Sequence, residues 1–320
     1  MGFWMGFSML TVLAGGVGAA KLLQGLVKIV PEDKLTIIVN TGDDIELHGL
    51  YISPDLDIIT YTLSGIVDEK KGWGVCKDSF NCLKMLGKYG LEEWFNLGDK
   101  DLATHIYRSK LLKNGFTLSE VTKKICQALG VKAKIIPMSN NKVETKIVTK
   151  TGTIHFQEYL VKRKAEDEVL NVKFDGIEKA EPCMEALEAI ENSEGIIISP
   201  SNPIVSIGPI LAVKGFKDAL KNLKNKVIAV TPLIQNAPVK GPADKLMKGL
   251  GLKVSAYTVA ELYKDFIEFF VLDKRDLALK NEIGKLNVKV IVTNTLMKSL
   301  KDKVELSKVI LKALKIQIQG

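Results

Sequence analysis

Cysteine, histidine and arginine are scarce in this chain of 320 residues, which has four cysteines and three histidines. The cysteines show no CxxC pair and no spacing with histidine of the kind that binds zinc. We therefore expect neither a structural zinc site nor a disulfide framework. We expect a reducing, cytoplasmic location. The four thiols belong to Cys76, Cys82, Cys126 and Cys183.

A long uninterrupted apolar run is also lacking. Residues 1–20 carry no charged side chain, but Gly15, Gly16 and Gly18 interrupt the stretch and no positive region precedes it. Both a signal peptide and a membrane span are therefore disfavoured. We interpret residues 1–8 as a short N-terminal extension, with Met9 as the natural start.

Acidic residues are outnumbered, with 37 against 45 basic ones, which gives a formal net charge of +8. The lysines are spread along the chain, and no basic run is interleaved with aromatic residues. This distribution favours a solvated surface or small anionic substrates over a nucleic-acid partner.

Short apolar runs alternate with stretches of helical periodicity along most of the chain. The runs at 9–14 and 35–40 flank a helix-like segment that ends at Pro31, which predicts a βαβ unit. Strands that are apolar on both faces and separated by helices are typical of a parallel sheet. We therefore predict an α/β fold, a Rossmann-like, mostly parallel sheet with helices on both faces. Its further strands are expected at residues 195–200, 226–233, 268–273 and 289–294.

The middle of the chain departs from this alternation. A capping box from Thr117 to Glu120 predicts a helix. Three strand-like runs then follow with little between them, which predicts an antiparallel excursion or a small antiparallel and helical subdomain over residues 131–178. The remaining residues, 9–130 and 179–320, are predicted to form a nucleotide-binding α/β core.

A glycine-rich loop follows the first predicted strand and leads into a helix. Gly15, Gly16 and Gly18 allow close approach of the backbone, and free N–H groups at a helix N-terminus suit a phosphate. The dinucleotide fingerprint requires a third glycine where this chain has Lys21, and the Walker A spacing is absent. A nicotinamide-dependent dehydrogenase is therefore a poor alternative. Taken alone, the loop is more typical of a tight turn without a ligand.

Four aspartates lie within fifteen residues after the second predicted strand. Ligands of open α/β sheets bind at this end of the strands. Converging carboxylates there are typical ligands of Mg²⁺, which completes its shell with water and substrate phosphate. Alternatively, each aspartate caps a turn or a helix, and the sequence leaves both interpretations open. The four residues are Asp43, Asp44, Asp55 and Asp57.

Two further segments contain candidate ligands. Residues 97–108 carry Lys100, His105 and Arg108 near a predicted helix start, which is typical either of a solvated helix face or of a phosphate-binding surface. Trp73 lies between two glycines and is either a loop anchor or an aromatic lid for a flat ring system.

A rigid polar loop follows the predicted strand at residues 195–200. It contains Ser201, Asn202 and Ser206 among three prolines. Fixed hydroxyl, amide and N–H donors after a buried strand suit a nucleobase, a ribose or a phosphate. A purely structural turn rarely needs so many of them.

Eight motifs then occur in one order along nearly the whole chain from Met9 onward: LAGGVGAAK, VNTGDD, SPDLD, GWG, LGDKDLATH, HFQEY, PSNPIVSIGPIL and APVKGPADKLM. On these motifs the chain resembles the 2-phospho-L-lactate transferases, which assemble the deazaflavin hydride carrier coenzyme F-420. Lys100 stands where the family usually has an arginine, so the bidentate contact of a guanidinium is lost at that position.

The resemblance implies a Mg²⁺-dependent transfer between small molecules. The donor would be similar to lactyl-2-diphospho-5′-guanosine, the acceptor would be the deazaflavin alcohol Fo, and GMP would leave. Related enzymes use an enolpyruvyl donor instead. The family allows a homodimer and implies neither a nucleic acid nor a membrane as partner.

The family and the positions of the motifs together suggest a role for each candidate residue. Mg²⁺ is expected on Asp57 with Asp43 or Asp44, and these carboxylates form the expected catalytic group. The expected substrate contacts are Gly15, Gly16, Gly18 and Lys21 at the donor diphosphate, Ser201, Asn202 and Ser206 at the guanosine, and Lys100, His105 and Trp73 at the acceptor.

A regulatory protein of the same superfamily, which binds a nucleotide sugar without catalysis, is the alternative. Such proteins share the glycine loop and the carboxylate loop but lack segments like LGDKDLATH and HFQEY. The presence of both segments favours the transferase.

Overall fold

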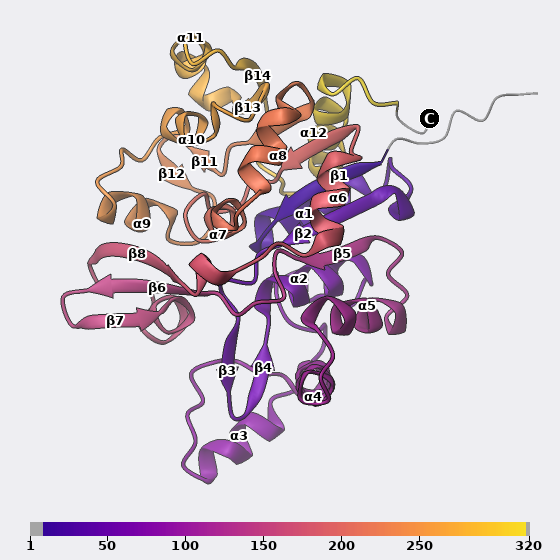
Figure 1. Cartoon of the computed structure of the whole chain (residues 1–320). Helices are drawn as coiled ribbons and strands as arrows, with labels where there is room; N and C mark the ends of the chain where they lie inside the picture. Colours follow the sequence, from indigo (N-terminus) through magenta and orange to yellow (C-terminus); the bar gives the residue numbers. More distant parts are fainter. Residues whose placement is uncertain (1–8, 318–320) are drawn as a thin grey trace, which may run out of the picture.

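The computed structural model describes residues 9–317, so the predicted extension at residues 1–8 lies outside the described residues. Its centre is a seven-stranded sheet in the order β14-β13-β10-β9-β1-β2-β5, in which all neighbours are parallel (Figure 1). The strands are β1 (Leu10–Ala14), β2 (Leu35–Val39), β5 (Lys134–Pro137), β9 (Gly195–Ile198), β10 (Val227–Val230), β13 (Phe269–Asp273) and β14 (Lys289–Thr293).

Both faces of the sheet are buried because its central strands are apolar at successive positions. Leu13 and Ile38 pack into the core on one face, whereas Val12 and Ile37 pack into the core on the other. The predicted α/β fold with helices on both faces is therefore confirmed. The first face is covered by α6 (Met184–Glu191), α7 (Ile207–Ala212), α8 (Phe216–Asn222), α10 (Ala256–Tyr263) and α11 (Lys280–Gly284), the second by α1 (Gly16–Leu26), α2 (Pro54–Leu63), α5 (Leu118–Ala128) and α12 (Leu300–Ala313). A further helix, α9 (Ala243–Gly249), packs against β8 and β12 instead.

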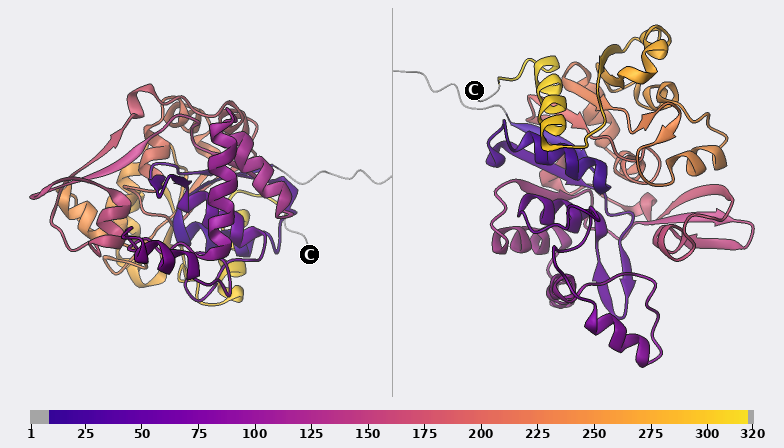
Figure 2. Two further views of the ribbon diagram at one scale, coloured as in Figure 1. Left: turned by 90° about the horizontal axis from the view of Figure 1, so that it is seen from below. Right: turned by 180° about the vertical axis from the view of Figure 1, so that it is seen from behind.

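A smaller group of elements extends away from the sheet. The hairpin of β3 (Ile45–Leu47) and β4 (Leu50–Ile52) projects beyond the sheet, with α3 (Asn81–Lys88) and α4 (Asp99–Lys113) beside it (Figures 1 and 2). A second short hairpin, β11 (Leu233–Ile234) with β12 (Ala237–Pro238), follows β10.

One strand expected in the antiparallel segment belongs to the parallel sheet instead. Ile135 in β5 lies opposite Ile37 in β2, with the two strands parallel. The preceding helix α5 packs against β5 and returns the chain to the sheet edge, as in a βαβ crossover. The antiparallel sheet itself consists of β6 (Glu144–Thr149), β7 (Gly152–His155) and β8 (Val169–Asp175). The division of the chain into a core and a subdomain at 131–178 stays a prediction.

Two helices begin with capping boxes. The helix predicted from Thr117 and Glu120 is confirmed as α5, and α12 begins with the same arrangement of Ser299 and Asp302. Each box satisfies backbone N–H groups that have no partner within the helix. Within residues 9–317, none of the helices combines the length and the apolar character that crossing a membrane requires.

We expect Gly25→Ala to destabilise the fold. A Cβ at Gly25 would lie 2.3 Å from the backbone oxygen of Lys303, where α1 packs against α12. Forcing the two helices apart should lower the free energy of unfolding by about 1–3 kcal/mol, measured by urea denaturation. Gly284→Ala is the matched control, because a Cβ there meets no atom within 4 Å. Equal losses in both variants would contradict this account of the packing.

Candidate active site

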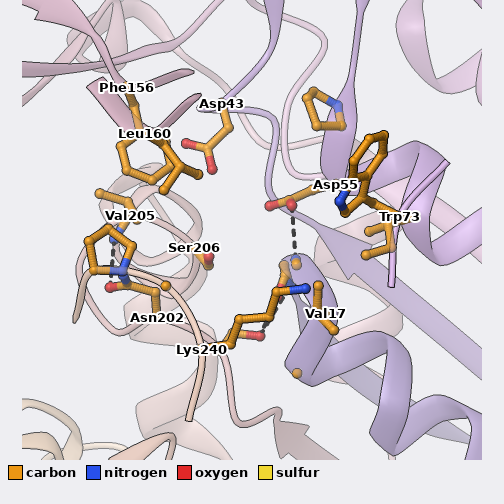
Figure 3. A pocket seen from close by; sticks show the side chains of 18 of the residues that line it. Val17, Asp43, Asp55, Trp73, Phe156, Leu160, Asn202, Val205, Ser206 and Lys240 are labelled. Atoms are coloured by element: carbon orange, nitrogen blue, oxygen red, sulfur yellow. Dashed lines mark hydrogen bonds between the residues drawn. The ribbon is translucent and has the colours of Figure 1, made fainter. Parts of the chain in front are cut away.

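A cavity of about 670 Å³ opens at the edge of the sheet where the parallel strands end (Figure 3). Its wall includes the loops after β1, β2, β9, β10 and β14, the segments after β7 and β12, the loop with Trp73 and parts of α2 and α4. After β1 the chain turns to a helix on one face, and after the neighbouring β9 it turns to a helix on the other. Ligands of open α/β sheets bind at such a switch point.

The glycine loop forms one side of this cavity and requires its glycines for steric reasons. A Cβ at Gly18 would lie 2.1 Å from the backbone oxygen of Pro200, and Gly16 has a φ of +66°. The backbone N–H of Gly16 donates to Oδ1 of Asp55 over 2.9 Å. The loop therefore lies where a phosphate-binding loop is expected, with one of its N–H groups held by a carboxylate.

Two buried carboxylates, those of Asp43 and Asp55, point toward each other across the cavity (Figure 3). Burial and the charge of Asp55 raise the pKa of Asp43 well above its ordinary value. Burial also raises the pKa of Asp55 to about 6, although Asn40 and Gly16 donate hydrogen bonds to it. Among residues 9–317, Oδ1 of Asp43 has no hydrogen-bond partner. Burial thus disfavours the charged forms of the two carboxyls, and a bound cation would stabilise those forms.

Asp44 is turned away from the cavity, although it follows Asp43 directly. Its carboxylate accepts hydrogen bonds from the hydroxyl of Tyr51 over 2.9 Å and from that of Ser53 over 2.7 Å. It does not belong to the cavity wall. Asp44 therefore connects the β3–β4 hairpin to the start of α2 and is not brought together with Asp43 and Asp55.

Asp57 lies in the cavity wall, but its carboxylate is paired with a buried arginine. The guanidinium of Arg108, which is 1% exposed, donates to both carboxylate oxygens, over 3.1 Å from Nη1 to Oδ2 and by a second bond from Nη2 to Oδ1. The ligand atoms of Asp57, Asp101 and His105 lie within 4.8 Å of one another, which makes them a second possible metal site.

Asp101 connects this group to α2. Its Oδ1 accepts a hydrogen bond from the hydroxyl of Tyr61 over 2.7 Å and lies 3.3 Å from Nε2 of His105. Burial acts to raise the pKa of Asp101, but the nearby His105 ring, the hydrogen bond from Tyr61 and the charge of Arg108 hold it below its ordinary value. The arginine thus supplies a cation to this group, whereas no cationic side chain pairs with Asp43 or Asp55 within residues 9–317.

The loop after β9 places all three of its predicted residues in the cavity wall. Ser201 Oγ accepts from the N–H of Gly15 over 3.3 Å and donates to its carbonyl oxygen over 2.6 Å. Oδ1 of Asn202 accepts the backbone N–H of Ile204 over 3.0 Å. Ser206 lies against Gly15, where a Cβ would come within 2.7 Å of the serine Cβ. This loop and the glycine loop therefore form one packed unit.

The remaining predicted residues separate into two groups. Lys21, Trp73 and His105 belong to the cavity wall. Lys100 does not, because its ammonium donates to the backbone oxygens of Cys76 and Lys77 over 3.3 Å and 3.1 Å. In this structure Lys100 therefore fixes the loop that contains Cys76 and Lys77.

Several wall residues were not selected from the sequence. Phe156 and Leu160 form an apolar side of the cavity, and Lys240 faces them from the segment after β12 (Figure 3). The HFQEY and APVKGPADKLM motifs contain Phe156 and Lys240, so these motifs were the available signal.

Comparison with known proteins agrees with this geometry. Residues 10–308 match the family model described as 2-phospho-L-lactate transferase CofD. The chain belongs to this enzyme family. Its identity with the 2-phospho-L-lactate transferase of Methanosarcina mazei is 43% over 302 residues, which covers 94% of this chain and 99% of that protein. For the 2-phospho-L-lactate transferase of Methanocaldococcus jannaschii the identity is 45% over 303 residues, covering 93% and 96%.

A solved structure supports the fold alone. The crystal structure of a UPF0052 family member from Bacillus halodurans superposes with a TM-score of 0.64 at 18% identity, covering 96% of this chain and 99% of that one. The transferase family and its α/β fold, predicted from the motifs, are therefore confirmed.

Removal of the buried guanidinium should be strongly destabilising. Arg108→Met leaves the charge of Asp57 buried without a partner, and we expect the free energy of unfolding to fall by about 3–5 kcal/mol. The double variant Asp57→Asn/Arg108→Met removes both charges and should recover much of this loss. Urea denaturation of both variants measures the effect, and a wild-type midpoint for Arg108→Met would show that the ion pair does not stabilise the fold.

Proposed function

We propose that this protein transfers a 2-phospho-L-lactate group, or its enolpyruvyl analogue, from a guanosine diphosphate-linked donor to the deazaflavin Fo and releases GMP. The proposal rests on one observation: the glycine loop, two buried carboxylates and an apolar wall all line the same cavity. Family membership supports the class of reaction. A homodimer stays an expectation taken from the family.

The cavity offers different surfaces to the two substrates. Trp73, Phe156 and Leu160 provide aromatic and apolar contact area that suits the flat ring of a deazaflavin. The glycine loop and the loop with Ser201 and Asn202 offer N–H, hydroxyl and amide groups that suit a nucleotide. In this arrangement the donor lies over the switch point and the acceptor lies against the segment after β7.

Mg²⁺ fits Asp43 and Asp55 best. The unpartnered Oδ1 of Asp43 and the facing carboxylate of Asp55 are oxygen ligands of the kind Mg²⁺ takes, with substrate phosphate and water completing its shell. Arg108 disfavours the expected ligand Asp57, because its positive charge lies against both oxygens of that carboxylate. When bound, the ion neutralises charge that moves between the phosphate oxygens.

The transfer requires one bond to form and one to break at the same phosphorus. The ribityl hydroxyl of Fo attacks the phosphorus that bears the lactyl group, and the bond from that phosphorus to the GMP oxygen breaks. The hydroxyl proton passes to a carboxylate of the cavity.

Binding of Fo tests the proposed acceptor directly. Isothermal titration with Fo should give micromolar affinity, strengthened by Mg²⁺ and a guanosine diphosphate analogue of the donor. Binding of the nucleotide without binding of Fo would contradict the transferase proposal and favour a regulatory nucleotide-binding protein.

Neutralising the facing carboxylates should remove the metal site. Asp43→Asn and Asp55→Asn should each weaken Mg²⁺ binding by about tenfold or more, because each loses a charged ligand. Asp218→Asn is the control, since this carboxylate is 79% exposed and remote from the cavity wall. Titration calorimetry measures the affinities. If Asp57→Asn alone abolished binding, Asp57 would be the ligand instead.

Proton binding at Asp55 predicts a pH dependence of the same site. The folded protein, without metal, retains a proton on this carboxyl up to about pH 6, whereas the unfolded chain loses it near pH 4. The stability of the metal-free protein should therefore fall as the pH rises through this window. Mg²⁺ displaces the proton, so its apparent affinity should rise between about pH 5 and pH 7 and then level off. An affinity independent of pH would contradict an ionisable ligand with a raised pKa.

A further inference from the structure

Lys240 lies in the short segment between β12 and α9, and its side chain extends toward the glycine loop (Figure 3). Its side chain reaches the cavity beside Val17 (Figure 3). Its ammonium donates to the backbone oxygen of Lys71 over 3.2 Å, and a Cβ at Gly72 would lie 3.4 Å from Nζ. The lysine therefore spans from the β11–β12 hairpin to the loop that carries Trp73.

The charge around Lys240 is unbalanced. Lys21 on α1 also lines the cavity, and within residues 9–317 neither lysine forms a salt bridge. Burial and the positive charge of Lys21 hold the pKa of Lys240 below its ordinary value. Burial lowers the pKa of Lys303 on α12, with Glu69 acting to raise it and the charge of Lys21 acting to lower it further. Cations that repel one another at a cavity wall are stabilised when an anion binds between them.

We propose that Lys240, together with Lys21, binds the diphosphate of the nucleotide substrate and ties it to the Trp73 loop. This assignment rests on the proposed function, because it names a further binding residue at the same site. An ammonium has three N–H donors, and one of them serves the carbonyl of Lys71. The other two are free to donate to phosphate oxygens without releasing the loop.

A diphosphate fits this position better than a single carboxylate. Lys21 lies on α1 and Lys240 lies in the segment after β12, so a ligand that contacts both lysines must present anionic oxygens to two separate elements. A diphosphate should therefore bind most favourably at the part of the wall that carries the two lysines.

The test compares Lys240→Met with Lys248→Met, a control that removes the same charge from an exposed position on α9 outside the cavity wall. Titrations with GDP, inorganic pyrophosphate and guanosine measure the affinities. Lys240→Met should weaken GDP and pyrophosphate binding by about tenfold or more while leaving guanosine binding unchanged. Lys248→Met should bind all three as the wild type does.

Two further variants keep the test decisive. Lys240→Arg retains the charge and should restore GDP binding, and Lys240→Gln replaces the methionine variant if that one does not fold. Wild-type GDP affinity in Lys240→Met or Lys240→Gln would overturn the assignment. Equal loss of guanosine binding would also overturn it, since that result indicates a structural role.

The nucleotide titrations do not involve Fo, so the two proposals can fail separately. If the wild type binds GDP but not Fo, the acceptor of the proposed function is wrong and the role of Lys240 is still decided by its variants. If the wild type binds neither GDP nor pyrophosphate, the assignment of Lys240 is overturned.

Discussion

The repulsion between two buried carboxylates is the constraint on which the site depends. Asp43 and Asp55 approach each other in a cavity that withholds the solvation a negative charge needs. Asn40 and the N–H of Gly16 stabilise Asp55, but Oδ1 of Asp43 has no partner among residues 9–317. Such a pair is retained by a protein that uses it, either through a bound cation or through a shared proton.

The fold explains how this unfavourable arrangement is held in place. Asp43 follows a central strand that is buried at every position, and Asp55 lies in the first turn of α2. The close packing of Gly18 against Pro200 fixes the glycine loop relative to the loop after β9. The Arg108–Asp57 ion pair holds α4 against α2. The buried turn after β2 and the start of α2 thus position the two carboxylates within packed surroundings.

The sequence predicts the parts of the structure that depend on local pattern. Apolar runs locate six of the seven strands of the parallel sheet, and Thr117 with Glu120 locates the start of α5. The sequence places β5 in the antiparallel segment, which is wrong, because an apolar run does not reveal whether its partner strand is parallel or antiparallel.

The side-chain partners within the site depend on contacts between distant residues. Asp55 and Asp57 are two positions apart, yet Arg108, 51 residues further on, takes the carboxylate of Asp57. Lys100 reaches backbone oxygens more than twenty residues before it. Tertiary packing decides which side chains pair with one another. The spacing of the aspartates therefore indicates a metal site but does not show which of them are its ligands.

The most direct measurement of the central claim is product formation by the purified protein supplied with Fo, the lactyl diphosphoguanosine donor and Mg²⁺, followed by mass spectrometry. The account predicts one GMP for each phospholactyl adduct of Fo, and loss of both products when a chelator removes the metal. Absence of the adduct in a sample that binds both substrates, or equal yields with and without the chelator, would contradict it.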